Sequence, residues 1–331
     1  MQKVKLGLIG LGYIGKTHLR NSLKLANASL EAVSDISKRA LNNAKKDGVR
    51  KTYTNYEQLF EDPQIDAVII ALPTHLHLDC AKKAAEAKKH ILLEKPIAKN
   101  VTEAKEILST AQKNDVKLMI GYPLRFNTTM CDLKNKLNTS ELGDIVAAYA
   151  TNVSTGPFMH RAQGHAPVPV PEWWFKKELT GGGALIDLGS HMINLLRWYL
   201  GEFTDIKSYL GYRFNLEFED QATCLGRFKS GATAVINVGY YSQKFQLKVE
   251  LLGTADHAVA ASIPPNPIIA AVQMLTTSTS SFWQPYIAEL EYFVNCIVAD
   301  MQPCPSGNDG LKDLQTIESA YKNSIQLDQS C

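Results

Sequence analysis

Residues 4–15 read VKLGLIGLGYIG, an apolar run that breaks into the spacing Gly10-x-Gly12-x-x-Gly15. Each glycine meets a different geometric demand of a dinucleotide-binding loop. The first permits a tight turn out of a strand, the second lets the backbone approach a pyrophosphate, and the third lets the next helix pack close to its strand. The N-terminus of that helix offers free N–H groups to the phosphates. The stretch therefore predicts a strand, a phosphate-binding loop and a helix.

An acidic residue follows the second predicted strand at the distance that this loop requires. Residues 30–34 form the strand, and Asp35 lies 20 residues beyond Gly15. A carboxylate there can accept hydrogen bonds from both ribose hydroxyls of an adenosine, and it repels the 2′-phosphate of NADP. We therefore expect NAD as the cofactor, with NADP possible because Lys38 and Arg39 follow closely. The alternative interpretation is an aspartate that caps a surface turn.

Length and composition indicate a globular protein of two domains. The chain has 331 residues, of which 45% are hydrophobic and 21% charged, and its formal net charge of +2 gives no basic field for nucleic acid. No apolar run approaches the roughly 20 residues of a membrane span, and the predicted core strand at the N-terminus leaves no room for a signal peptide. Six cysteines are scattered without a CxxC pair. We therefore expect a cytoplasmic protein with no metal site and no nucleic-acid or membrane partner.

The first third of the chain alternates predicted strands with predicted helices. The strands are expected at residues 3–10, 30–34, 67–72, 90–93 and 117–122. Helical patterns between strands favour parallel pairing, and nearly continuous apolar runs such as AVIIAL indicate strands buried on both faces. These features predict an α/β fold, in which a doubly wound parallel sheet of the Rossmann type forms a cofactor-binding domain over residues 1–123.

Residues 124–331 predict an α+β domain with a large, mostly antiparallel sheet. Residues 222–241 read ATCLGRF-KSG-ATAVINVGYY, a hairpin with Gly231 at its turn. The open face of such a sheet would bury well against a second copy, so we expect a homodimer or homotetramer formed through this sheet. A Pro- and His-rich loop, residues 156–171, precedes these strands, and its role is open.

Two further segments contain candidate residues of a ligand-binding or catalytic site. Glu94-Lys95-Pro96 follows the strand at residues 90–93, and ligands of open parallel sheets bind beyond the carboxyl ends of the strands. The alternative is a solvated lysine, although Pro96 restrains the lysine backbone.

The second segment is Gly181-Gly182-Gly183, which opens a helical pattern and suggests a backbone that something approaches closely. Asp187 and His191 then share one helix face, where the carboxylate favours the charged imidazolium. The alternatives are a surface ion pair and a buried histidine with its hydrogen bonds satisfied.

Other candidates lie near the expected strand ends. Residues 71–77 read ALPTHLH, and two histidines without Cys or acidic residues at ligand spacing favour nicotinamide positioning or plain structure over zinc. Tyr122 and Arg125 follow the last parallel strand, with substrate contact and domain packing as alternatives. Trp173 and Trp174 offer aromatic faces on which sugars stack, and we expect one of them, Trp174, at the substrate.

These motifs together resemble those of the Gfo/Idh/MocA family of glucose–fructose oxidoreductase and myo-inositol dehydrogenase. The resemblance spans essentially the whole chain through GLIGLGYIGKTHL with His18, PTHLH, EKP, GGGALIDLGSH, VELLGT and SGNDGLKDLQTIESAY. It implies a nicotinamide-dependent oxidoreductase that oxidises a ring secondary alcohol of a sugar or polyol, or reduces the matching ketone. It also implies that Lys95 contacts the reacting oxygen, that His191 is the acid/base and that Asp187 supports both.

The expected binding residues fall into two sets. Those for the cofactor are Gly10, Gly12, Tyr13, Ile14, Gly15, Asp35, Leu72, Pro73, Thr74, His77, Glu94 and Lys95. Those for the substrate are Lys95, Tyr122, Arg125, Trp174, Asp187 and His191. Three residues of the Pro-rich loop are possible covers of the substrate: His160, Arg161 and His165.

Two other functions stay open alongside the sugar or polyol dehydrogenase. A nucleotide-linked sugar as substrate would need cations for its diphosphate, for which the nearby supply is Arg161, Lys176 and Lys177. A non-catalytic dinucleotide sensor would lack the proton-handling groups, whereas this chain has Lys95 and His191. Neither the sugar or polyol nor the physiological direction follows from the residues.

Overall fold

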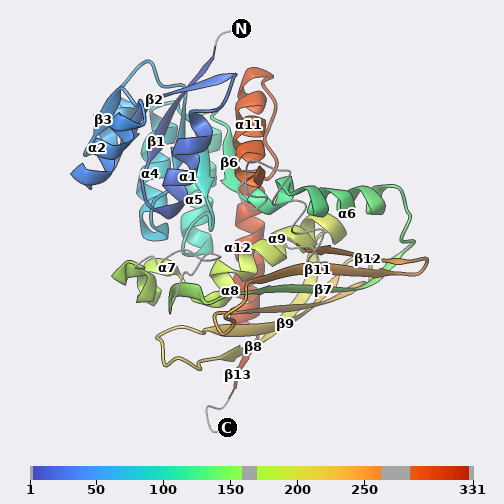
Figure 1. Cartoon of the computed structure of the whole chain (residues 1–331). Coiled ribbons are helices and arrows are strands. Elements are labelled where there is room, and N and C mark those ends of the chain that lie inside the picture. Colours follow the sequence, from blue (N-terminus) through green and yellow to red (C-terminus); the bar gives the residue numbers. More distant parts are fainter. Residues whose placement is uncertain (1–2, 159–169, 262–283, 328–331) are drawn as a thin grey trace. The chain divides into compact units, whose positions relative to one another are not determined.

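The computed structural model describes residues 3–158, 170–261 and 284–327 (Figure 1). It divides into two compact units, which are described separately below. Unit 1 comprises Met1–Pro123 and Trp283–Leu311, and unit 2 comprises Leu124–Phe282 and Lys312–Cys331. Unit 1 therefore includes Trp283–Leu311, a segment distant in sequence that the alternating strands and helices of the first third did not predict. His160, Arg161 and His165 lie outside the described residues.

Unit 1 contains a six-stranded sheet in the order β3-β2-β1-β4-β5-β6, and every neighbouring pair is parallel. The strands are β1 Val4–Ile9, β2 Ala28–Ser34, β3 Lys51–Tyr53, β4 Ala67–Ile70, β5 His90–Glu94 and β6 Leu118–Gly121. This arrangement confirms the doubly wound Rossmann-type sheet. Strand β4 is buried throughout, as its unbroken apolar run predicts. Strand β3 was missed because its residues, Lys-Thr-Tyr, are only half-buried at the sheet edge.

Two helices of unit 1, α2 Lys38–Lys46 and α5 Val101–Lys113, begin at residues whose side chains cap them. Unit 1 also contains α1 Tyr13–Ser22, α3 Glu57–Phe60, α4 His77–Glu86 and α11 Gln284–Val298. The Ser37 hydroxyl accepts a hydrogen bond from the N–H of Ala40 at the start of α2, as expected from the sequence. Asn100 does the same for α5 through the N–H of Glu103.

Unit 2 contains a seven-stranded mixed sheet in the order β12-β11-β7-β10-β9-β8-β13. Its strands are β7 Ile145–Val153, β8 Phe203–Gly211, β9 Gln221–Phe228, β10 Thr233–Gly239, β11 Gln246–Gly253, β12 His257–Ala261 and β13 Ser324–Gln326. Four neighbouring pairs are antiparallel and two are parallel, which confirms the mostly antiparallel sheet. The β9–β10 hairpin turns at Gly231, whose φ is +92°.

Helices cover one face of this sheet. They include α6 Thr128–Asn138, α7 Lys177–Thr180, α8 Ala184–Asp187 and α9 Gly189–Leu200, while α12 Gly307–Lys322 runs from the end of unit 1 into unit 2. Figure 1 shows α8 and α9 on the same side of the sheet, where α9 packs against β7 and β10. The buried and exposed residues of β9 alternate, so the other face of this strand is exposed among the described residues.

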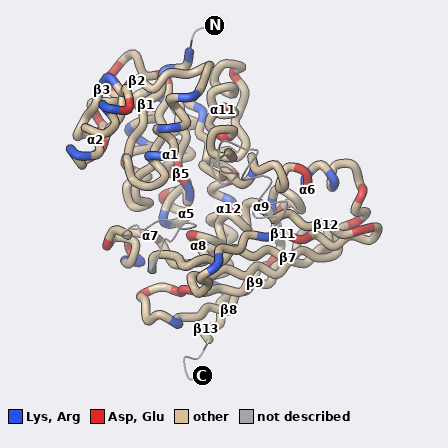
Figure 2. The backbone as a smooth tube through the Cα atoms, in the orientation of Figure 1, with Lys and Arg blue, Asp and Glu red and all other residues tan. Residues whose placement is uncertain are grey.

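Lys and Arg are interspersed with Asp and Glu along the backbone of both units (Figure 2), in keeping with a net charge of +2. Within the described ranges, no helix has both the length and the apolar character needed to cross a membrane.

Candidate active site

The three glycines of the first loop differ in what surrounds them. A Cβ on Gly10, whose φ is +91°, would lie 2.4 Å from the carbonyl oxygen of Ala71, and one on Gly15 would lie 2.0 Å from that of Gly10. The chain itself therefore requires glycine at both positions. A Cβ on Gly12, by contrast, would meet nothing within 4 Å. Gly12 is the N-cap of α1 and no side chain caps this helix, so the helix N-terminus and the open space both fit a cofactor pyrophosphate.

Asp35 joins the first loop to the second helix. One carboxylate oxygen, Oδ2, accepts a hydrogen bond from the N–H of Leu11 at 2.6 Å, and the other, Oδ1, accepts one from the N–H of Ser37 at 2.7 Å. The bond to Ser37 is a turn-capping contact of the kind that the alternative interpretation expected, whereas the sequence did not predict the bond to Leu11. Each carboxylate oxygen has a second lone pair, so these bonds are compatible with hydrogen bonds from a ribose.

The segment after β4 is held by His77, which is 1% exposed. Its Nε2 lies 2.9 Å from the carbonyl oxygen of Leu72 and its Nδ1 lies 2.9 Å from that of Pro96. Burial lowers the pKa of His77, although the two carbonyls act in the opposite direction. The ring thus joins the end of β4 to the Lys95-Pro96 segment. In the part of the chain that the structure describes, no group of three metal-ligating side chains gathers here or elsewhere.

Two buried acidic residues of unit 1, Glu94 and Glu289, interact electrostatically, and Glu94 directly precedes Lys95. Glu94, which ends β5, places Oε1 2.7 Å from the Nε2 of His18 on α1. Glu289 on α11 is fully buried, and its burial together with the charge of Glu94 raises its pKa well above the ordinary value. The sequence gave no signal for Glu289, because it lies in unit 1 through a segment distant in sequence.

All predicted cofactor residues belong to unit 1 and follow neighbouring strands. The first loop follows β1, Asp35 follows β2, the segment 72–77 follows β4, and Lys95 follows β5. Because these strands are parallel and adjacent, the residues gather at one edge of the sheet. Lys95 is half-buried there. Unit 1 therefore brings the predicted cofactor residues together at this edge of its sheet.

A backbone oxygen and a side-chain hydroxyl of unit 2 fill the space that the Gly181–Gly183 turn leaves. A Cβ on Gly183 would lie 1.9 Å from the backbone oxygen of Glu219, and one on Gly182 would lie 2.3 Å from the hydroxyl oxygen of Tyr321. The close approach inferred from the sequence is therefore real, and the approaching groups are the protein's own. Gly181 ends α7 with φ +85°.

The carboxylate of Glu219 organises this turn. Its Oε1 accepts hydrogen bonds from the N–H of Gly183 at 3.1 Å, the N–H of Leu185 at 2.9 Å and the hydroxyl of Tyr321 at 2.7 Å. Burial raises the pKa of Glu219, and these donors partly counteract that effect. The turn leads into α8, which ends at Asp187, and into α9, which carries His191.

Asp187 also receives a hydrogen bond from outside its helix. The Tyr240 hydroxyl, at the end of β10, donates to Asp187 Oδ2 at 3.0 Å. Two sets of hydrogen bonds thus hold the helices that carry the predicted pair: Glu219 and Tyr321 hold the turn before α8, and Tyr240 holds Asp187 at the end of α8, directly before α9 with His191. The sequence predicted Asp187 and His191 through their spacing. The other three residues give no local signal, because they are distant in sequence and their residue types are common on surfaces.

The remaining predicted substrate residues have defined surroundings. Tyr122 is buried in unit 1. Arg125, in unit 2, donates from Nε to Asn194 Oδ1 at 2.7 Å, and its guanidinium lies 5.6 Å from the centre of the Trp198 ring. Trp174 is half-buried beside Trp173, with the ring centroids 5.9 Å apart. The structure therefore shows Arg125 in packing contacts within unit 2.

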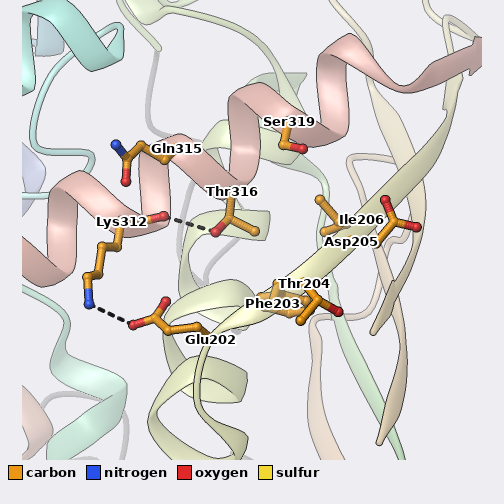
Figure 3. A pocket seen from close by; sticks show the side chains of 9 residues that line it. All are labelled: Glu202, Phe203, Thr204, Asp205, Ile206, Lys312, Gln315, Thr316 and Ser319. Atoms are coloured by element: carbon orange, nitrogen blue, oxygen red, sulfur yellow. Dashed lines mark hydrogen bonds and ion pairs between the residues drawn. The ribbon is translucent and has the colours of Figure 1, made fainter. Parts of the chain in front are cut away.

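A cavity of about 300 Å³ lies in unit 2 between β8 and α12 (Figure 3). Its lining includes Glu202, Lys312 and Thr316, and the Lys312 ammonium lies 2.9 Å from Glu202 Oε1. The hydrogen bond from Arg197 is the main cause that lowers the pKa of Glu202 to about 2. None of the predicted site residues lines this cavity.

Comparison with known proteins identifies the family. The model described as "Oxidoreductase family, NAD-binding Rossmann fold" matches residues 4–122, and the one described as "GFO/IDH/MocA C-terminal domain" matches residues 131–259. A myo-inositol 2-dehydrogenase of Thermotoga maritima is 27% identical, covering 99% of this chain and 98% of that protein. A scyllo-inositol 2-dehydrogenase (NAD(+)) of Bacillus subtilis is 27% identical over 98% and 97%.

A solved structure agrees with these sequence matches. The crystal structure of a probable dehydrogenase from Thermotoga maritima superposes with a TM-score of 0.84 at 25% identity, covering 96% of each chain. The two family models together match most of the chain, and the glycine loop of unit 1 has the open space that a bound dinucleotide requires. The chain therefore belongs to the GFO/IDH/MocA family of NAD-binding oxidoreductases.

Proposed function

We propose that the protein is an NAD-dependent dehydrogenase that oxidises a ring secondary alcohol of a sugar or polyol, or reduces the matching ketone. The main support is the hydrogen bonding around α8: Glu219 holds its first turn, and the Tyr240 hydroxyl donates to Asp187 at its end, directly before the helix that carries His191. The inositol dehydrogenases named above support a cyclic polyol as the first substrate class to test.

The chemistry divides between the cofactor and the side chains. The bound nicotinamide supplies the hydride acceptor or donor. His191 takes the hydroxyl proton as the substrate is oxidised, since imidazole changes its charge near neutral pH. Asp187 favours the imidazolium that forms, and the ammonium of Lys95 stabilises the developing alkoxide. In reduction the same groups act in reverse.

We also infer a preference for NAD over NADP. Asp35 accepts two backbone N–H groups, and the negative charge of its carboxylate opposes a 2′-phosphate. In Asp35→Asn the amide oxygen keeps an acceptor but the charge is lost, so we expect the ratio of NADP to NAD affinity to rise about tenfold. Calorimetric titration with each cofactor measures this ratio. A wild-type protein that binds NADP as tightly as NAD would contradict the preference.

A homodimer or homotetramer through the open face of the second sheet belongs to the same proposal. Leu225, Val235 and Tyr149 are direct cross-strand neighbours on that face, and Leu225 and Tyr149 are exposed. The exposed Val259 continues the row on β12 through its neighbour Glu250. Such a row favours burial against a second copy. Light scattering of the purified protein gives the number of chains, and a monomer at all concentrations would contradict this part.

The decisive assay follows absorbance of the reduced nicotinamide while compounds are screened with NAD and with NADP. The panel contains myo-inositol, scyllo-inositol, D-glucose and D-xylose, with their keto forms for the reverse direction. We expect turnover with at least one cyclic polyol or sugar. Tight NAD binding without turnover on any compound of this chemistry would instead support a dinucleotide sensor.

A further inference from the structure

Tyr240 is fixed in position by the chain around it. Its backbone N–H donates to the carbonyl oxygen of Asp220 at 2.8 Å, directly beyond the end of β10. Its ring packs so closely on Gly156 that a Cβ there would lie 2.1 Å from a ring carbon. The side chain is 4% exposed. With the backbone tied and the ring enclosed, the hydroxyl that contacts Asp187 has little freedom to point elsewhere.

The hydroxyl of Tyr240 donates to Asp187, whereas the other nearby acidic side chains accept hydrogen bonds from other donors. Burial, followed by the charge of Asp187, raises the pKa of Tyr240 well above the ordinary value, so the phenol stays protonated and donates. Glu219 and Tyr321 also act on it electrostatically, but they are already joined to each other. The Asp220 carboxylate accepts from the N–H of Phe214 at 2.6 Å.

We propose that Tyr240 is a positioning residue, whose hydroxyl holds the Asp187 carboxylate in one orientation and thereby sets the orientation and proton affinity of His191, four positions along the chain. A hydrogen bond to a carboxylate is charge-assisted and keeps the carboxylate ionised. The inference rests on the proposed function, which assigns His191 as the acid/base. It adds Tyr240, which follows strand β10, to Asp187 and His191, which lie on helices α8 and α9.

The test compares Tyr240→Phe with Tyr199→Phe. Both remove one buried phenol hydroxyl from unit 2, since the Tyr199 hydroxyl donates to the carbonyl oxygen of Met130 at 2.9 Å, and Tyr199 lies on α9 with His191. With NAD and the panel compound that the wild type oxidises fastest, Tyr240→Phe is expected to lower kcat about tenfold or more at little change in KM. Tyr199→Phe should leave kcat and KM nearly unchanged.

The pH profile separates positioning from mere stability. Without the Tyr240 hydroxyl, the negative charge of the Asp187 carboxylate is less compensated and favours the protonated form of His191 more strongly. His191 must be deprotonated to accept the hydroxyl proton, so the acid limb of the pH profile of kcat for oxidation should move to higher pH. The effect must vanish in the Asp187→Asn background if Tyr240 acts through Asp187. A Tyr240→Phe protein with the kcat and pH profile of Tyr199→Phe, or an equal loss in the Asp187→Asn background, would overturn the proposal.

Two further measurements keep the test decisive. If Tyr240→Phe does not fold, replacing Tyr240 by 3-fluorotyrosine keeps the ring and hydroxyl but strengthens the donor, so the acid limb should move to lower pH. The pH dependence of His191 modification by diethyl pyrocarbonate, followed by peptide mass spectrometry, needs no substrate. If no panel compound turns over, the proposed function fails, and an unchanged His191 titration in Tyr240→Phe would separately overturn the role of Tyr240.

Discussion

The two glycine-rich turns of this protein use glycine for opposite reasons. In unit 1, a Cβ on Gly12 would meet nothing within 4 Å, so the space beside that backbone is left open. In unit 2, a Cβ on Gly183 would lie 1.9 Å from the backbone oxygen of Glu219. The first turn therefore provides room for a ligand, whereas the second provides room for the protein's own polar network.

The comparison shows that glycine spacing alone does not reveal what the glycines approach. Gly10 and Gly15 in the first turn are also required by the chain, which leaves Gly12 as the position whose side is open. Substitutions at Gly12 should therefore affect ligand binding, and those at Gly183 should affect folding. The predictions below test this separation.

The largest effect is expected on cofactor binding by Gly12→Val. The branched side chain would occupy the space where backbone and pyrophosphate meet, so we expect no detectable NAD binding by calorimetry, a loss of at least about 100-fold. Because Gly12 has φ −66° and open surroundings, the variant should still fold. A folded Gly12→Val that binds NAD as tightly as the wild type would show that this loop does not hold the cofactor.

Gly183→Ala should have the next largest effect, and on stability. The added methyl group overlaps a backbone oxygen that cannot move without shifting the strand connection at Glu219. We expect the free energy of unfolding in urea to fall by about 3 kcal/mol or more. Gly12→Ala is the matched control and should change it by less than about 0.5 kcal/mol. Equal stabilities for the two alanine variants would break the comparison.

Tyr321→Phe should have a smaller effect that depends on pH. Burial raises the pKa of Glu219, so its native carboxyl binds a proton more tightly than in the unfolded chain. Stability then falls as the pH rises from the ordinary glutamate range through the raised value. Removing the Tyr321 donor raises that pKa further, so the variant should lose about 1–3 kcal/mol at neutral pH. It should lose less at about pH 4, where the carboxyl is largely protonated.

Urea unfolding at both pH values measures the difference. A loss of equal size at both would mean that Tyr321 stabilises the turn by packing and not by its hydrogen bond to Glu219.

Much of the fold follows from local patterns in the sequence. The parallel sheet of unit 1 was predictable because its inner strands are continuous apolar runs, and the β9–β10 hairpin because its residues alternate around Gly231. Strand β3 was missed because a short, half-buried edge strand has no such run. The place of α11 in unit 1 was missed because an amphipathic helix does not identify its partner.

The candidate site was predictable only as far as its residues are close in sequence. Asp187 and His191 share a helical spacing, and Lys95 follows a strand, so local rules find them. Glu219 and Tyr240 hold the two ends of α8 from a loop and a strand end. Their burial depends on the sheet register, which a single sequence does not display. For the same reason, the sequence alone did not identify what fills the Gly181–Gly183 turn.

The most direct test of the account compares NAD affinity and turnover in His191→Ala, with the exposed His257→Ala as control. Cofactor binding is proposed for unit 1 and proton transfer for His191 in unit 2. We therefore expect His191→Ala to have an NAD dissociation constant close to that of the wild type and a kcat about 10²–10⁴-fold lower, while His257→Ala keeps both. Near-normal turnover in His191→Ala, or a loss of NAD affinity that matches the loss of turnover, would contradict the account.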